Sequence, residues 1–238
     1  MRRLAILLSA TLALAGCGSG AAKAKSDQIT VLAASSLTEA FTTLAHEYER
    51  AHPGVRVRLV FGASSSLARQ VTAGAPADVI ATASMSTIKG LSGVGKPAVF
   101  AHNRLAIAVP PGNPGNVHGL ADLGRPALRV AVCAPQVPCG DAARRAFAAA
   151  HITGRPDTYE QDVKAVLAKV ELGEVDAGLV YRTDIQAAGR RVIGLPVDPP
   201  VVAAYPILAL RAAGSGFVAF VRSGRGRAVL AAAGFDPP

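Results

Sequence analysis

Short apolar segments alternate with amphipathic segments along most of the chain, and this alternation restricts the fold more than any other feature. One series of such segments begins at residue 29 and a second begins at residue 130. A strand-like segment followed by a helix-like one, repeated in this way, is typical of a mostly parallel sheet with helices on both faces. Proline-rich joints near residues 111 and 199 break the pattern. The sequence therefore predicts an α/β fold with two lobes that are linked by two crossing segments.

The first predicted lobe is discontinuous in sequence. A strand-like segment at residues 203–210 and two helix-like segments after it are expected to return to that lobe. We therefore assign residues 29–104 and 204–238 to lobe 1, and residues 105–203 to lobe 2. Half of the residues are hydrophobic, which is enough for a core in each lobe and excludes a disordered chain.

The N-terminus has the features of an export signal. Two arginines at positions 2 and 3 precede an apolar run that ends in Leu14-Ala15-Gly16-Cys17. A basic start, a short apolar run and small residues before a cut are typical of a secretory signal, here residues 1–16. The run is too short to cross a bilayer as a stable helix.

The residues around Cys17 resemble a bacterial lipobox, in which the cysteine is diacylated and becomes the mature N-terminus. This resemblance implies an exported lipoprotein, anchored by its lipid to the outer face of the cell membrane. Residues 17–28, rich in Gly, Ala, Ser and Lys, would form a flexible tether. The alternative is ordinary cleavage after Ala15, which leaves Cys17 as a free thiol.

The basic balance of the chain does not predict a nucleic-acid partner. The formal net charge is +9, but the Lys and Arg residues are scattered along the sequence. Aromatic residues are few, Trp is missing, and none interleave with the basic residues as in a nucleic-acid groove. We interpret the charge as a basic solvated surface whose weak positive field helps to gather an anion.

Two cysteines remain once Cys17 is assigned to lipid. Cys133 and Cys139 lie close together in sequence, and in an oxidising compartment such a pair favours a disulfide. Metal binding is the alternative, but no further Cys lies nearby and the five His residues show no ligand-like spacing. The sequence therefore predicts no direct metal ligands and no cofactor.

Five candidate binding residues are spread along the chain. Four lie where helices are expected to begin, and the fifth ends an apolar run; they are Ser36, Ser64, Cys139, Val163 and Tyr181. Helix N-termini offer unpaired N–H groups and a partial positive charge, so several of them together can hold a small, fully ionised oxyanion without Lys or Arg. Each residue also has a structural interpretation. Ser36 with Glu39 has the form of a helix capping box, and a Tyr at a strand end is often a core residue.

Four motifs together resemble the bacterial molybdate-binding (ModA) family. They are Ala33-Ala34-Ser35-Ser36-Leu37-Thr38, Phe61-Gly62-Ala63-Ser64-Ser65-Ser66-Leu67-Ala68-Arg69-Gln70, Ala73-Gly74-Ala75-Pro76-Ala77-Asp78-Val79 and Gly178-Leu179-Val180-Tyr181-Arg182-Thr183-Asp184. The resemblance extends from about residue 29 to residue 235. It implies the two-lobed fold of type II periplasmic binding proteins and a monomeric protein that delivers molybdate, and also tungstate, to the permease of an ABC importer.

The resemblance also implies how the oxyanion would be held. Two serines come from lobe 1, and they match Ser36 and Ser64. Lobe 2 supplies a backbone N–H from a V-P-x-G turn, a Val that follows an Asp, and a Tyr hydroxyl; these match Cys139, Val163 and Tyr181. Cys139 stands where many relatives have Ala, and a disulfide to Cys133 would make this loop more rigid without blocking its N–H.

Two alternatives to molybdate binding remain open. The same fold could hold another oxyanion such as sulfate, which has the same charge and shape as molybdate but shorter bonds. Phosphate is less suited, because it carries a proton at neutral pH and none of the five residues is acidic. A Ser-dependent enzyme is the other alternative, but the triple Ser64-Ser65-Ser66 is not part of a Ser-x-x-Lys or Gly-x-Ser-x-Gly motif, and the histidines have no evident triad partners.

Overall fold

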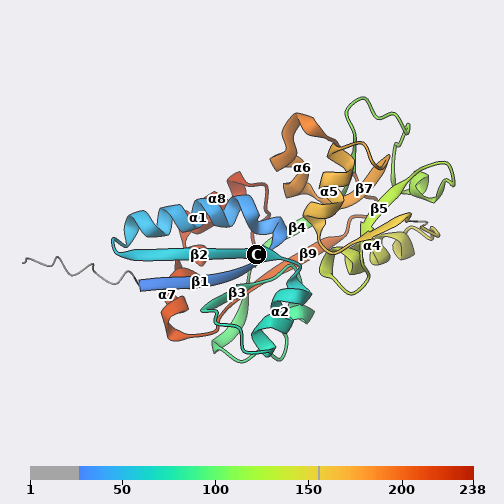
Figure 1. The fold of residues 1–238 in the computed structure, drawn as a ribbon. Helices are drawn as coiled ribbons and strands as arrows, with labels where there is room; N and C mark the ends of the chain where they lie inside the picture. The colour runs from blue at the N-terminus through green and yellow to red at the C-terminus, as the bar shows by residue number, and fades with distance from the viewer. Residues whose placement is uncertain (1–26, 155) are drawn as a thin grey trace, which may run out of the picture.

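A long strand, β4 (Val94–Val109), runs through both halves of the molecule and joins them. The computed structural model describes residues 27–154 and 156–238. Its strands follow the order β2-β1-β3-β9-β4-β7-β5-β6, and β8 also pairs with β4. Figure 1 shows the two groups of strands and helices on either side of the crossing strands β4 and β9 (Val202–Ala209). We call these groups lobe 1 and lobe 2.

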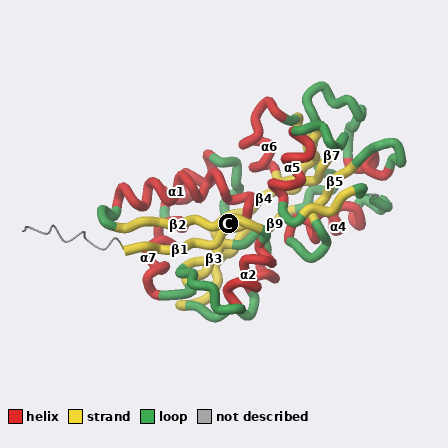
Figure 2. The backbone as a smooth tube through the Cα atoms, viewed as in Figure 1, coloured by secondary structure: helices red, strands yellow, loops and turns green. Residues whose placement is uncertain are grey.

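Lobe 1 is built on three parallel strands in the order β2-β1-β3, and β9 pairs with β3. Helices flank this sheet (Figure 2). The strands are β1 (Asp27–Ala34), β2 (Val55–Gly62) and β3 (Val79–Ala81). The helices are η1 (Ser35–Leu37), α1 (Thr38–Ala51), α2 (Ser64–Thr72), α3 (Met85–Ile88), η4 (Ala212–Gly214), α7 (Ser215–Arg222) and α8 (Gly224–Ala232).

Lobe 2 repeats this arrangement with the parallel order β6-β5-β7. The strands are β5 (Val130–Cys133), β6 (Thr158–Glu160), β7 (Ala177–Tyr181) and β8 (Ile193–Pro196). The helices are η2 (Leu120–Gly124), α4 (Pro138–Ala149), α5 (Val163–Glu171), α6 (Arg182–Ala188) and η3 (Gly189–Arg191).

The two crossing strands account for the antiparallel part of the fold. Among the described residues, every antiparallel pair of named strands includes β4 or β9. β4 pairs with β9 up to Arg104 and with β7 and β8 from Leu105 onward. Each lobe is therefore a parallel βαβ sheet into which a crossing strand enters from the other lobe, as the α/β prediction required.

An aromatic cluster fixes α1 against the crossing strands. Phe41, Leu44 and Tyr48 lie three and four residues apart, so they share one face of α1, and all three are buried. The Phe41 ring centroid lies 5.8 Å from that of Phe100 on β4 and 6.1 Å from that of Phe217 on α7. This packing sets the position of the turn η1, which comes directly before α1.

The first strand begins earlier than the sequence predicts. Asp27 and Gln28, assigned above to the tether, belong to β1, because their backbone pairs with Val55 and Arg56 of β2. Their side chains are exposed, so no apolar pattern marks them as a strand. The signal residues 1–16 and Cys17 lie outside the described residues. In the part that the structure describes, no helix has the length and apolar character needed to span a membrane.

Candidate functional site

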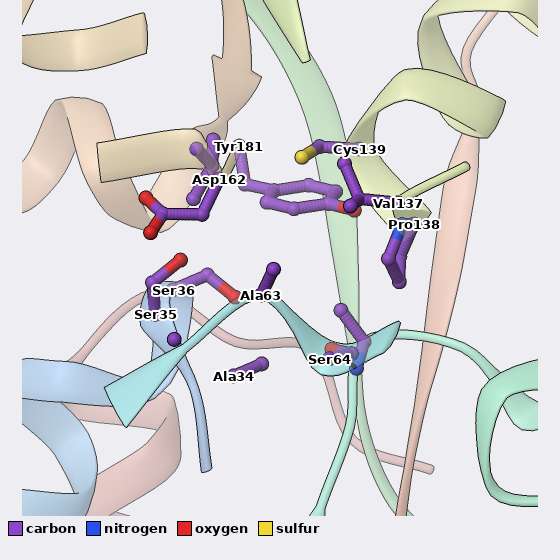
Figure 3. A pocket seen from close by; sticks show the side chains of 13 residues that line it. Ala34, Ser35, Ser36, Ala63, Ser64, Val137, Pro138, Cys139, Asp162 and Tyr181 are labelled. Atoms are coloured by element: carbon purple, nitrogen blue, oxygen red, sulfur yellow. Dashed lines mark hydrogen bonds between the residues drawn. The ribbon is translucent and has the colours of Figure 1, made fainter. Parts of the chain in front are cut away.

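A cavity lies between the lobes at the carboxyl ends of their parallel strands, which is where ligands bind in open α/β sheets. Lobe 1 contributes the residues that follow β1, β2 and β3, and lobe 2 contributes those that follow β5, β6 and β7 (Figure 3). The lining residues are Ala34, Ser35, Ser36, Gly62, Ala63, Ser64, Ala83, Val137, Pro138, Cys139, Asp162, Val163 and Tyr181. The structure thus brings all five sequence-predicted residues to one cavity.

The cavity is small, with a volume of about 10 Å³. Pockets for drug-sized organic ligands measure about 300 Å³ or more, so this cavity is too small for such a ligand. Its walls come from both lobes, so a small guest held here contacts both lobes at once.

Ser36 lies in the turn η1, and its side chain does not cap α1. The helix begins at Thr38, and no side-chain cap bond is present at its N-terminus, so the expected capping box with Glu39 is wrong. Instead the Ser36 Oγ lies 2.8 Å from the hydroxyl oxygen of Tyr205 on β9. The short 3-10 turn places Ser36 before the helix, where its side chain faces the cavity rather than the first turn of α1.

Ser64 is the first residue of α2 and is buried. Its Oγ accepts a hydrogen bond from the backbone N–H of Ala83, with an N···O distance of 3.1 Å. Because a backbone N–H can only donate, the hydroxyl proton of Ser64 remains free for another partner. Ser64 therefore presents a donor to the cavity.

Two helix N-termini of lobe 2 face the serines. Cys139 lies in the first turn of α4, and Val163 is the first residue of α5, so their amides have no partner within the helix. Asp162 caps α5, because its Oδ1 accepts from the N–H groups of Lys164 at 2.9 Å and of Ala165 at 3.1 Å. The cavity wall of lobe 2 therefore includes the free amides of Cys139 and Val163, beside the Asp162 carboxylate.

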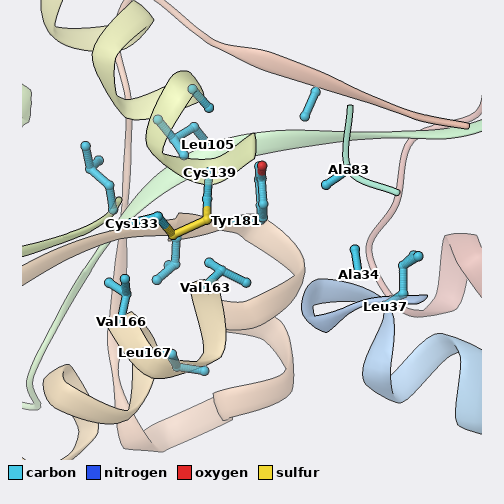
Figure 4. Packing of buried hydrophobic residues seen from close by; sticks show 14 of the residues in the cluster. Ala34, Leu37, Ala83, Leu105, Cys133, Cys139, Val163, Val166, Leu167 and Tyr181 are labelled. Atoms are coloured by element: carbon cyan, nitrogen blue, oxygen red, sulfur yellow. A yellow bond between two sulfur atoms is a disulfide. The ribbon is translucent and has the colours of Figure 1, made fainter. Parts of the chain in front are cut away.

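A disulfide holds the start of α4 against the end of β5. It joins Cys133 to Cys139, and both residues are buried (Figure 4). The next residue is Gly140, where a Cβ would collide with the carbonyl oxygen of Ala134. Only glycine therefore allows α4 to begin this close to the strand. The crosslink and the glycine together fix where the Cys139 amide lies.

Tyr181 ends β7 and is 1% exposed. Within the described part of the chain, its hydroxyl has no hydrogen-bond partner. A buried polar group without a partner costs about 1–3 kcal/mol, so such a group calls for an explanation. Burial raises the pKa of Tyr181 above its ordinary value, which keeps the hydroxyl protonated. Figure 3 shows its ring lying across the cavity from Ser36 and Ser64.

One lysine lies beside the cavity, but its charge is already balanced. The Lys164 Nζ lies 2.8 Å from Glu39 Oε1 on α1 and 3.1 Å from Asp184 Oδ1 on α6. Burial alone would lower the pKa of Lys164, but the two carboxylates outweigh it and raise that pKa. No Lys, Arg or His lines the cavity. The positive potential there comes from hydroxyls and helix N-termini, Asp162 is the one carboxylate in the lining, and the Lys164–Glu39 ion pair connects the two lobes.

Several lining residues carry no sequence signal of their own. Ala34, Gly62, Ala63 and Ala83 offer backbone and space, and Asp162, which the sequence marks only as the residue before Val163, caps α5. Among the described residues, no group of three or more His, Cys, Asp or Glu is placed to hold a metal ion. The chemistry that this cavity can perform is hydrogen-bond donation to a small guest.

This architecture, two α/β lobes closing on a donor-lined cavity, is that of a solute-binding protein. Residues 29–236 match the family model described as bacterial extracellular solute-binding protein. The chain belongs to this family.

The chain is also similar to individual proteins whose names state the ion that they bind. The molybdate-binding protein ModA of Mycobacterium tuberculosis strain H37Rv is 40% identical over 221 residues, which cover 88% of this chain and 85% of that protein. The periplasmic molybdate-binding protein of Azotobacter vinelandii aligns with a TM-score of 0.73 at 20% identity, over 88% of this chain and 99% of that one. The sulfate-binding protein SubI of M. tuberculosis H37Rv aligns with a TM-score of 0.75 at 18% identity, over 89% and 87%. Because the sequence identities of the last two proteins are low, their structural similarity shows a shared fold and nothing more.

Asp184, behind the cavity, gives a testable pH dependence. Burial raises its pKa from 3.8 to about 6, although Lys164 opposes this. The folded protein then binds this proton more tightly than the unfolded chain. The resulting stability is fully present below about pH 4 and is lost as the pH rises through about 6. Urea unfolding at pH 4 to 7 measures the free energy of unfolding of the wild type and of Asp184→Asn. We expect the wild-type value minus the variant value to fall as the pH rises, by up to about 3 kcal/mol. A difference that does not change with pH would contradict this.

Proposed function

We propose that this protein captures molybdate, and also tungstate, between its lobes and delivers the ion to the permease of an ABC importer. The observation that carries the proposal is the buried Tyr181 hydroxyl, which has no partner among the described residues and faces a cavity lined by other donors. A tetrahedral oxyanion is an acceptor on every side and satisfies such donors together. The names of the ModA relatives support the choice of ion.

The proposed ligands are three hydroxyls and two amides. Ser36 and Ser64 donate from lobe 1, Tyr181 donates from lobe 2, and Cys139 and Val163 donate through their backbone N–H groups. Hydrogen bonds from such fixed donors to an ion are charge-assisted, so they are stronger than bonds between neutral groups. The dipoles of α4 and α5 add a partial positive charge at the same point.

This donor set favours a fully ionised oxyanion over a protonated one. Hydrogen phosphate must place its proton on an acceptor, and none of the five proposed ligands is acidic; Asp162, the one carboxylate that lines the cavity, uses Oδ1 to cap α5 and has Oδ2 as its remaining acceptor. Sulfate satisfies the same donors, so size must separate it from molybdate. Sulfate is therefore the competitor that the experiments below include.

The proposal also covers the cellular location and the oligomeric state of the protein. We place it outside the cytoplasm as a lipoprotein, anchored through a lipid on Cys17, and acting as a monomer. It binds and releases its ligand without chemical change, because its candidate ligands include no nucleophile activated by a neighbouring base. The lipobox-like sequence supports the lipid anchor, and the lack of a Ser-x-x-Lys or Gly-x-Ser-x-Gly motif at Ser64-Ser65-Ser66 supports binding without chemical change.

Thermal denaturation tests the choice of ion. At a hundredfold excess over its Kd, a ligand that binds only the folded state stabilises it by about 2.7 kcal/mol. For a chain of this size the expected rise in Tm is about 5–10 °C. Molybdate and tungstate should produce this rise, whereas sodium sulfate at the same concentration should not. Equal shifts with molybdate and sulfate would contradict the molybdate assignment.

Tyr181→Phe tests the residue that carries the proposal. The variant removes one donor to a charged guest, worth about 1.5–3 kcal/mol, so the Kd for molybdate should rise at least about tenfold in calorimetric titration. The fold should survive, because this hydroxyl makes no hydrogen bond among the described residues. Tyr159→Phe is the matched control: Tyr159 lies in the same lobe with 56% of its surface exposed, and its variant should bind like wild type. An unchanged Kd in Tyr181→Phe would make Tyr181 a core residue only.

A further inference from the structure

Tyr205 contacts the site from behind, without lining the cavity. It lies on the crossing strand β9, is fully buried, and approaches Ser36 Oγ to 2.8 Å. Either oxygen of this pair could donate to the other. Which one donates decides whether Ser36 offers the cavity a proton or a lone pair.

Asn103 on β4 decides the direction. Its Oδ1 accepts from the backbone N–H of Arg104 at 2.9 Å, which identifies the other end of the amide as Nδ2. That nitrogen donates to the Thr183 hydroxyl at 2.8 Å and, over a longer 3.5 Å, to the Tyr205 hydroxyl. Because an amide nitrogen only donates, the Tyr205 oxygen is the acceptor in this contact.

The Ser36 oxygen is the nearest acceptor for the proton of Tyr205, at 2.8 Å, whereas the neighbouring Tyr181 hydroxyl makes no hydrogen bond among the described residues. Among the described residues, the hydroxyl of Tyr205 has Ser36 and Asn103 as its hydrogen-bond partners, and Asn103 offers it no acceptor. A buried donor left without an acceptor is costly, so Tyr205 donates to Ser36. The Ser36 oxygen is thereby an acceptor within the protein, and its own proton is free to point into the cavity.

We propose that Asn103 and Tyr205 form a hydrogen-bond relay that turns the Ser36 proton toward the bound anion, which makes Tyr205 a positioning residue for ligand binding. The inference rests on the proposed function, since it assumes that the guest is an acceptor. Ser64 reaches the same donor state by another route, through the N–H of Ala83. The two serines of lobe 1 therefore offer protons for different reasons, and only Ser36 depends on Tyr205.

The ring of Tyr205 is held independently of its hydroxyl. Its centroid lies 5.3 Å from that of Phe235, 6.0 Å from that of Tyr181 and 6.4 Å from that of Phe100. Tyr205→Phe keeps these contacts and removes only the relay oxygen. This makes it a clean probe of the hydrogen bond.

The test is a pair of double-mutant cycles, read as the Kd for molybdate by calorimetry. Tyr205→Phe in the wild-type background should weaken binding about fivefold, the size of one neutral hydrogen bond. In a Ser36→Ala background, Tyr205→Phe should have no further effect, because the proton it positions is gone. In a Ser64→Ala background the fivefold loss should remain. A purely structural role of Tyr205 would give the same loss in all three backgrounds, and that result would overturn the proposal.

Two further variants complete the design. Tyr48→Phe removes the hydroxyl of another buried tyrosine of lobe 1, which packs on Phe217 away from the cavity, and should leave the Kd unchanged. Should Tyr205→Phe not fold, Asn103→Leu tests the same relay, with a loss that again disappears in the Ser36→Ala background. A loss that persists there overturns the proposal.

The failure of the relay is distinguishable from the failure of the proposed function. If the wild-type protein binds no molybdate, the proposed function fails. The double-mutant cycles are then measured with tungstate or sulfate, whichever the protein binds. If it binds none of the three ions, the relay proposal fails as well. If the wild-type protein binds molybdate and Tyr205→Phe leaves the Kd for molybdate unchanged, only the relay proposal fails.

Discussion

The structure depends on one geometric constraint: parallel strands that are followed by helices bring unpaired donors to a single edge. Three strands of each lobe end at the cavity, and α2, α4 and α5 begin there. The N–H groups of a first helical turn cannot be satisfied within the helix. Two such edges facing one another make a cavity rich in donors, and an oxyanion is the guest that satisfies them from both sides.

The surroundings of the cavity keep these donors uncommitted. Lys164 is paired with Glu39 and Asp184, so no cation competes with the hydroxyls for the guest. The oxygen of Ser64 is engaged by Ala83, which leaves its proton free. The disulfide and Gly140 hold the Cys139 amide in place. Such preorganisation lowers the cost of binding, because few groups must be ordered when the ion arrives.

Sequence patterns predicted the elements whose signal is local. Segments such as β7 and α5 follow their apolar periodicity closely, and the five candidate residues, which the structure gathers at one cavity, mark strand ends and helix starts. Their role in binding stays a prediction. Elements that depend on partners far away in the sequence were missed. The first half of β4, with Gly95, Lys96 and Pro97, is exposed or half-buried and forms a strand through its pairing with β9. The orientation of Ser36 depends on Tyr205 and Asn103, 169 and 67 positions away in sequence, which no local pattern reveals.

The central claim is that uncharged donors from both lobes hold the ion. A crystal structure of the molybdate complex, with the metal located by its anomalous scattering, tests this directly. The account predicts oxyanion oxygens within about 2.5–3.2 Å of the hydroxyls of Ser36, Ser64 and Tyr181 and of the amides of Cys139 and Val163. An ion held by a Lys, Arg or His side chain, or bound outside the cavity between the lobes, would contradict it.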